Sequence, residues 1–199
     1  DGAMFGYGTP IGSHMAPHSP HYVDLTGMYP HDPEKARALL EEAGHGDGLT
    51  LTLKLPPPAY ARRGGEIVAS QLREVGIETE IVPLEWAQWL EEVFRGKDYD
   101  LTIVSHTEPQ DIDIYGRPDY YFHVDDRELQ DILSALAVAN DPDRRGELLE
   151  AAQRRIAELS VNGFLFQLAK LGVWRTALEG MWPDAPVQAN DVTDVHWAE

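Results

Sequence analysis

Two periodicities of apolar residues alternate along the middle of the chain, and together they predict helices alternating with strands. Residues 49–55 read LTLTLKL, and this strict alternation of apolar and polar positions is typical of a strand with one buried face. Residues 77–84 and 100–104 form the second and third predicted strands. Predicted helices at residues 62–75 and 86–94 separate the three, and connections of this length favour parallel strands joined by right-handed crossovers.

Start and stop signals indicate further helices. Asp32 is a candidate N-cap, Pro33 takes the first helical position, and a glycine closes this helix. Two more helices are predicted over residues 126–139 and 143–159, because an Asp-Pro pair between them acts as a stop and restart signal. Residues 164–168 are predicted to form a fourth strand. We therefore expect an α/β fold with a mixed, largely parallel sheet flanked by helices.

The predicted domain organisation has three parts. Residues 1–30 contain nine glycines and prolines, and this density of breakers predicts an extended lead-in arm. Residues 31–175 contain the alternating helices and strands, and we expect them to form the α/β lobe. Residues 176–199 are rich in Pro, Asp and Asn and form a carboxy-terminal return segment. Because the chain begins at Asp1 and not at a methionine, we expect it to be a piece of a longer protein.

Composition and charge exclude several classes of function. The chain has 34 acidic residues against 16 lysines and arginines, so its formal charge is −18. This charge argues against a nucleic acid partner or an anionic membrane surface, since both attract clustered cations. The absence of cysteine excludes a disulfide framework, a cysteine-ligated zinc site and thiol catalysis. The apolar stretches are short and interrupted and the amino end is not basic, so we expect no membrane span or signal peptide.

Three histidines near the amino end suggest one alternative function, a stand-alone metal-binding module. His14, His18 and His21 are the candidate ligands, because imidazole is a frequent ligand of transition metals. On a helix His14 and His18 would share a face, but Pro17 and Pro20 break such a helix. No carboxylate stands at a defined spacing beside them. We therefore expect an arm with polar side chains, and no metal or other cofactor.

An enzyme is a second alternative. Glu108, Asp111 and Asp113 would then act as acid and base in a small hydrolase-like protein. The sequence has no Gly-x-Ser-x-Gly elbow, no phosphate-binding loop and no His-Glu-x-x-His motif. It also offers no partner that would separate the pKa values of these carboxyl groups. We therefore expect no catalytic residues.

Four segments, taken in order, resemble a single family of proteins. They cover most of residues 1–175 and read YPHDPEKARALLEEAG (29–44), LTLTLKL (49–55), QLREVGIETEIVPLEWAQWL (71–90) and GKDYDLTIVSHTEPQD (96–111). The segment LEGMWPD (178–184) also looks like the closing stretch of that family. The chain resembles the large extracellular solute-binding proteins of ABC importers, of the peptide/nickel-binding (family 5) type. The resemblance is to the carboxy-terminal lobe of a two-lobed, periplasmic-binding-protein-like fold.

This resemblance implies a function in transport. It predicts the substrate-binding component of an ABC importer, which binds a peptide or similar small solute in a cleft between two lobes. The expected partners are the missing amino-terminal lobe, the solute and the permease subunits, and no nucleic acid. The expected location is the periplasm or the outer face of the membrane, and the expected protein is not an enzyme.

The loop after the third strand is the predicted binding site, because open α/β sheets bind ligands beyond the carboxy ends of their strands. In the family this loop carries Trp-x-x-Asp and then Asp-Pro, and in peptide binders the first Asp pairs with the ligand's amino group. Here His106 stands near the Trp position and Glu108-Pro109 resembles the Asp-Pro. The alternative is that the acidic residues of this loop, such as Glu108 and Asp111, cap turns or face solvent. In that alternative the aromatic residues that follow, beginning with Tyr115, hold the loop on its own lobe. The predicted ligand-binding residues are His106, Glu108, Asp111, Tyr115 and Trp86, whereas Trp89 is expected in the core.

Overall fold

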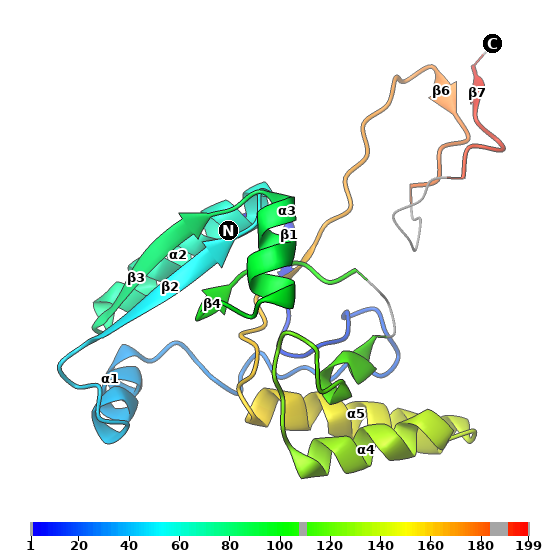
Figure 1. The fold of residues 1–199 in the computed structure, drawn as a ribbon. Helices are drawn as coiled ribbons and strands as arrows, with labels where there is room; N and C mark the ends of the chain where they lie inside the picture. The colour runs from blue at the N-terminus through cyan, green and yellow to red at the C-terminus, as the bar shows by residue number, and fades with distance from the viewer. Residues whose placement is uncertain (1, 108–110, 184–190, 199) are drawn as a thin grey trace. The chain divides into compact units, whose positions relative to one another are not determined.

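The computed structural model describes residues 2–107, 111–183 and 191–198 of the 199-residue chain (Figure 1). The chain divides into two units, Asp1–Gln167 and Leu168–Glu199. The second unit contains a short antiparallel ladder between β6 (Leu178–Glu179) and β7 (His196–Trp197). In the ranges described, no helix has the length and apolar character needed to cross a membrane. The first unit contains the main sheet, the longer helices and the candidate site.

A three-stranded parallel sheet forms one layer of the first unit. Its order is β3-β2-β4, with β2 (Leu49–Leu55) in the centre and β3 (Ile77–Pro83) paired along its whole length. On the other side β4 (Leu101–Thr102) pairs with two residues of β2. The prediction of three mutually parallel strands is therefore confirmed, although the third strand is shorter than expected. Before it begins, the Asp100 carboxylate accepts the backbone N–H of Thr52 (2.7 Å), which replaces a ladder bond there.

The two crossover helices pack closely on this sheet. The first, α2 (Ala59–Glu74), begins three residues earlier than predicted, directly after a proline run. Gly65 lies so close to the sheet that an added Cβ would stand 2.3 Å from the buried Leu55 side chain. The second, α3 (Trp86–Trp89), continues as a π-helical turn over Leu90–Arg95.

A buried lysine connects the sheet to the π-helical turn. Lys54 on β2 is 8% exposed, and its Nζ donates to Glu92 and to Asp98, each at 2.9 Å. The hydrogen bond to Glu92 and then that to Asp98 raise the pKa of Lys54 above its ordinary value. The charge is therefore compensated where β2 approaches its carboxy end.

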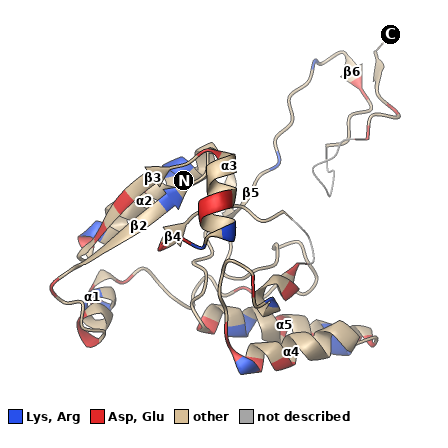
Figure 2. Cartoon of the chain, viewed as in Figure 1, with Lys and Arg blue, Asp and Glu red and all other residues tan. Residues whose placement is uncertain are grey.

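A helical hairpin forms the second layer. The two predicted helices, α4 (Arg127–Val138) and α5 (Pro142–Glu158), are present and lie side by side (Figure 1), and each begins at an aspartate N-cap. The first of these caps, Asp126, also receives two hydrogen bonds from Arg155 at 3.0 and 2.6 Å. Acidic and basic positions are interspersed along both helices, as Figure 2 shows. The core of this layer joins the hairpin to a 3₁₀ helix, η2 (Ile112–Gly116).

The predicted amino-terminal helix is present but exposed. It is α1 (Pro33–Glu42), and Asp32 caps it by accepting the backbone N–H of Lys35 (3.0 Å). No residue of this helix is buried, and Leu39 on its apolar stripe is 54% exposed. The capping signals therefore determined this helix, whereas its apolar stripe does not contribute to the core.

The amino-terminal segment packs along the first unit. Within it β1 (Gly8–Pro10) pairs with β5 (Phe166–Leu168), so the predicted fourth strand does not join the main sheet. Further on, the fully buried Ser13 lies with its hydroxyl 3.0 Å from Oε1 of Gln153 on α5. The Gln153 amide donates to the backbone carbonyl of His21 (2.7 Å). The arm is thus poor in regular structure, as its glycines and prolines predict, but it is fixed to α5.

Candidate ligand-binding site

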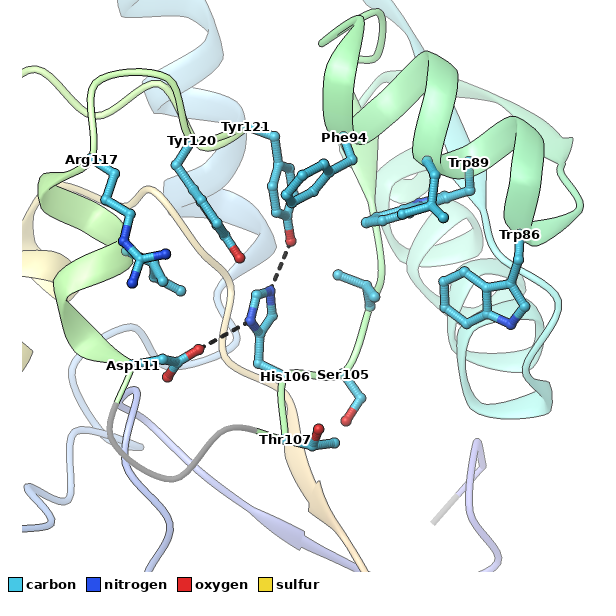
Figure 3. Close-up of a pocket in the computed structure, with 13 residues that line it drawn as sticks. Trp86, Trp89, Phe94, Ser105, His106, Thr107, Asp111, Arg117, Tyr120 and Tyr121 are labelled. Carbon is cyan, nitrogen blue, oxygen red and sulfur yellow. Dashed lines mark hydrogen bonds and ion pairs between the residues drawn. The ribbon is translucent and has the colours of Figure 1, made fainter. Parts of the chain in front are cut away.

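A cavity of about 380 Å³ opens where β4 ends. Figure 3 shows side chains from three segments converging on it: α3 with its π-helical turn, residues 104–107 after β4, and residues 111–121. This position agrees with the predicted loop and with the usual place of ligand crevices in open α/β sheets. The residues that line it include Trp86, Trp89, Phe94, His106, Asp111 and Tyr121.

The first wall is aromatic and comes from α3 and the π-helical turn. Trp89 is 4% exposed, stacks edge-on with Trp86 at 5.7 Å between ring centroids, and donates its indole N–H to Thr102 (3.0 Å). Trp86 is 43% exposed and Leu90 42%. The apolar face of this helix is wide enough to serve two surfaces. Trp89 on it packs in the core, whereas Trp86 and Leu90 are partly exposed and line the cavity. The prediction that Trp89 belongs to the core is confirmed.

The second wall comes from the segment that follows η2. Tyr121 is 3% exposed, and its hydroxyl lies 2.9 Å from Nε2 of His106. The two rings are nearly parallel, at 12°, with centroids 6.2 Å apart. Burial raises the pKa of the Tyr121 hydroxyl, so it remains a neutral donor. The backbone of this residue is fixed as well, because the Tyr99 hydroxyl donates to its carbonyl (2.7 Å).

Asp111 lies between two histidines at the floor of the cavity. Its Oδ1 is 2.8 Å from Nε2 of His14, and its Oδ2 is 3.4 Å from Nδ1 of His106. Its side chain is only 12% exposed. Burial opposes its ionisation, but the hydrogen bonds from His106 and His14 outweigh burial and hold the pKa of the carboxyl well below its ordinary value.

Each histidine is supported on its other side by a tyrosine hydroxyl. Nδ1 of His14 is 3.3 Å from the hydroxyl of Tyr115, which accepts the side-chain N–H of Asn162. One arrangement of protons satisfies every member. In it each imidazole donates an N–H to Asp111 and accepts the O–H of a tyrosine, Tyr115 for His14 and Tyr121 for His106. The network joins the amino-terminal arm, the loop after β4 and the segment after α5.

The structure brings three of the predicted ligand-binding residues together. Trp86, His106 and Asp111 all line the cavity. Tyr115 is 2% exposed and does not line the cavity, because η2 turns its ring into the core of the hairpin layer. A ligand contact by Tyr115 stays a prediction, and its burial does not favour that contact. Glu108 falls outside the described residues, so its role also stays a prediction.

Phe94 and His14 belong to the site but were not predicted from the sequence as binding residues. Phe94 lines the cavity from the end of the π-helical turn, 37% exposed. His14 reaches Asp111 across 97 positions of sequence, a separation at which no local pattern signals contact. Phe94 lies in the π-helical turn, whose wider spacing departs from the regular helix that the sequence predicts there.

The three histidines of the metal-binding alternative have different surroundings. His14 bonds to Asp111, whereas Nδ1 of His18 lies 3.5 Å from the amide nitrogen of Gln167. His21 packs instead against α5, where its ring fills the space beside Gly146. Within the described ranges, no three His, Asp or Glu side chains are arranged to hold a metal ion. The histidines therefore serve separate contacts.

Several similar curated proteins bear the names of binding proteins. The chain is 38% identical over 82 residues to the dipeptide-binding protein of Escherichia coli (strain K12), a match that covers 39% of this chain and 15% of that protein. It is 32% identical over 102 residues to heme-binding protein A of Haemophilus influenzae, covering 49% and 18%. It is 35% identical over 92 residues to the glutathione-binding protein GsiB of Salmonella typhi, covering 46% and 18%. The chain thus spans less than a fifth of each of these relatives, and none of the three is named as an enzyme.

Similar solved structures agree on the fold. The dipeptide-binding protein from Pseudoalteromonas sp. SM9913, in complex with Met-Leu, has a TM-score of 0.78 at 22% identity, covering 98% of this chain and 41% of that one. The oligopeptide-binding protein AppA from Bacillus subtilis, in complex with a nonapeptide, has a TM-score of 0.79 at 21% identity, covering 98% and 43%. These likenesses confirm the α/β class and the predicted relation to a periplasmic binding protein of the two-lobed fold.

The family itself follows from the sequence. Residues 1–127, more than half of the chain, match the model of the bacterial extracellular solute-binding proteins, family 5 (middle part). The match includes the strands of the main sheet, both crossover helices and every wall of the cavity. The chain belongs to the family 5 bacterial extracellular solute-binding proteins.

Proposed function

We propose that this chain is part of the substrate-binding component of an ABC importer, and that the cavity beside β4 binds a peptide or similar small solute. The protein would deliver this solute to a permease from the periplasm or the outer face of the membrane. The observation that carries the proposal is the position of an aromatic cavity at the carboxy end of β4 in a chain of this family.

The chemistry of the cavity suits a small amphipathic solute. Small-molecule sites are mostly apolar, with a few polar groups that fix orientation, and measure roughly 300–1,000 Å³. This cavity, at about 380 Å³, lies at the lower end of that range. Its polar members are held by their own hydrogen bonds, so they are ordered before a ligand arrives, which reduces the entropy lost on binding.

Residues outside this chain would complete the site. Small-ligand sites bury about 70–90% of the ligand surface, but Trp86 at the rim is 43% exposed. In this proposal residues 31–175 form the binding lobe, and a second lobe closes over the cavity and excludes water. Glu108 would face the ligand from the same loop as His106.

The proposal can be tested by calorimetric titration with the dipeptide L-phenylalanyl-L-alanine. We expect saturable binding by this chain, and binding tighter by tenfold or more when a second lobe is present in a longer protein. Trp86→Leu should weaken binding about tenfold or more, because it removes the exposed ring of the first wall.

Trp197→Leu is the matched control, since this tryptophan is 61% exposed and lies on β7 in the second unit. It should leave the affinity unchanged. Absence of saturable binding, or equal loss in the two variants, would show that the cavity is not the binding site.

A further inference from the structure

The charged groups of the cavity are already compensated by one another. Both carboxylate oxygens of Asp111 face an imidazole nitrogen. Arg117, also in the lining, donates two hydrogen bonds to Asp113, at 3.1 and 2.9 Å. Among the described residues of the lining, Asp111 and Arg117 are the charged ones, and each has a partner within the protein.

A ligand ammonium would gain little from Asp111. To reach the carboxylate it would have to displace one imidazole N–H, and the released histidine would lose a partner in a partly buried site. The carboxylate is 12% exposed, so it offers little surface for approach. Leaving a buried polar group without its partner costs about as much as a new hydrogen bond gains.

Two partly exposed aromatic side chains, Trp86 and Phe94, line the cavity. Trp86 and Phe94 are 43% and 37% exposed, whereas their neighbours Trp89 and Tyr121 are buried and hold them from behind. Phe94 packs edge-on against Tyr120 at 5.6 Å between centroids. In Figure 3 Trp86, Trp89 and Phe94 project from α3 and its π-helical turn, and Tyr121 lies beside Phe94. Rings supported in this way present rigid faces to an incoming ring.

We infer that the cavity selects a small solute that carries an aromatic ring, which stacks on Trp86 and Phe94, and that Asp111 positions His106 instead of binding the solute's ammonium group. This inference rests on the proposed function and names its substrate class. Aromatic pairs gain from their geometry in addition to the area they bury, so a ring is bound better here than a methyl group. Asp111 acts through His106, whose ring forms part of the floor.

The test is calorimetric titration of the full chain with three probes: L-phenylalanyl-L-alanine, L-alanyl-L-alanine and N-acetyl-L-phenylalanyl-L-alanine. We expect the first to bind about tenfold or more tightly than the second. Trp86→Leu should reduce this ratio below about threefold, and the control Trp197→Leu should preserve it. Equal affinity for the first two probes would overturn the inference and leave the proposed function intact.

The role of Asp111 is tested by the acetylated probe. The ratio of affinities for the free and acetylated dipeptides should be the same, within about threefold, in the parent chain and in Asp111→Asn. A ratio that is large in the parent chain and falls to one in Asp111→Asn would identify Asp111 as the ammonium partner and refute the inference. Binding of none of the probes would refute the proposed function, and the inference with it.

Discussion

Replacing Gln153 by leucine should detach the amino-terminal arm from α5. The Gln153 side chain is fully buried, donates to the His21 carbonyl (2.7 Å), and lies 3.4 Å from the backbone N–H of Val23. Leucine is similar in size but offers neither a donor nor an acceptor. The variant therefore removes the side-chain partner of two backbone groups of the arm, each of which costs about 1–3 kcal/mol when buried without one. We expect the free energy of unfolding to fall by about 2–6 kcal/mol.

Urea denaturation followed by circular dichroism measures this loss directly. A chain of this size loses about 2–4 °C in Tm for each kcal/mol, so the Tm should fall by about 4 °C or more. The matched control is Gln71→Leu, the same substitution at an exposed position of α2. A loss below about 1 kcal/mol, or one equal to that of the control, would refute the idea that Gln153 fixes the arm.

Three further predictions concern stability. In Lys54→Met, stability should decline less as the pH rises. The raised pKa of Lys54 gives the parent chain stability that is present below about pH 10.4 and is lost above it. An equal fall in the urea midpoint of the two proteins between pH 9 and 11 would contradict this. In Asp126→Asn, the acid decline should be smaller. The hydrogen bond from a paired arginine lowers the pKa of Asp126 to about 2, so its contribution is present above about pH 4 and is lost below it; acid titration of the urea midpoint measures it, and parallel curves would contradict it. Gly65→Ala should lower the free energy of unfolding by about 1–3 kcal/mol, and with it the Tm, because the added methyl group overpacks Leu55. Gly27→Ala, with open space around it, should not; equal thermal melts would disprove the close contact.

The main sheet could be predicted because its signals are local. The alternation in β2 and the capping aspartates each lie within one element, where the backbone and its nearest neighbours determine the outcome. The same reasoning overestimated β4, which is two residues long where five were expected. Its length depends on how far the chain stays beside β2 after the π-helical turn, and apolar sequence alone does not specify that distance.

The site could be predicted only in part, for the same physical reason. The loop after β4 could be predicted as the site because ligands of open α/β sheets bind beyond the carboxy ends of parallel strands. One of the two histidines beside Asp111 could not be predicted, because His14 comes from a glycine- and proline-rich arm without periodicity. Tyr115 is predicted to contact the ligand because tyrosines suit binding sites as well as cores. A 3₁₀ turn places its ring in the core, so this contact stays a prediction.

The attachment of the arm also has a consequence in time. Ser13 and Gln153 are 140 positions apart in sequence, so the arm cannot dock before α5 has been synthesised. At about 5–20 residues per second, that delay is roughly 7–28 s on the ribosome. Helices form within microseconds and non-local strand pairings within milliseconds to seconds, so α1 and the parallel ladder between β2 and β3 can form during this wait. Docking of the arm, which closes a loop of this length, is then among the last steps of folding.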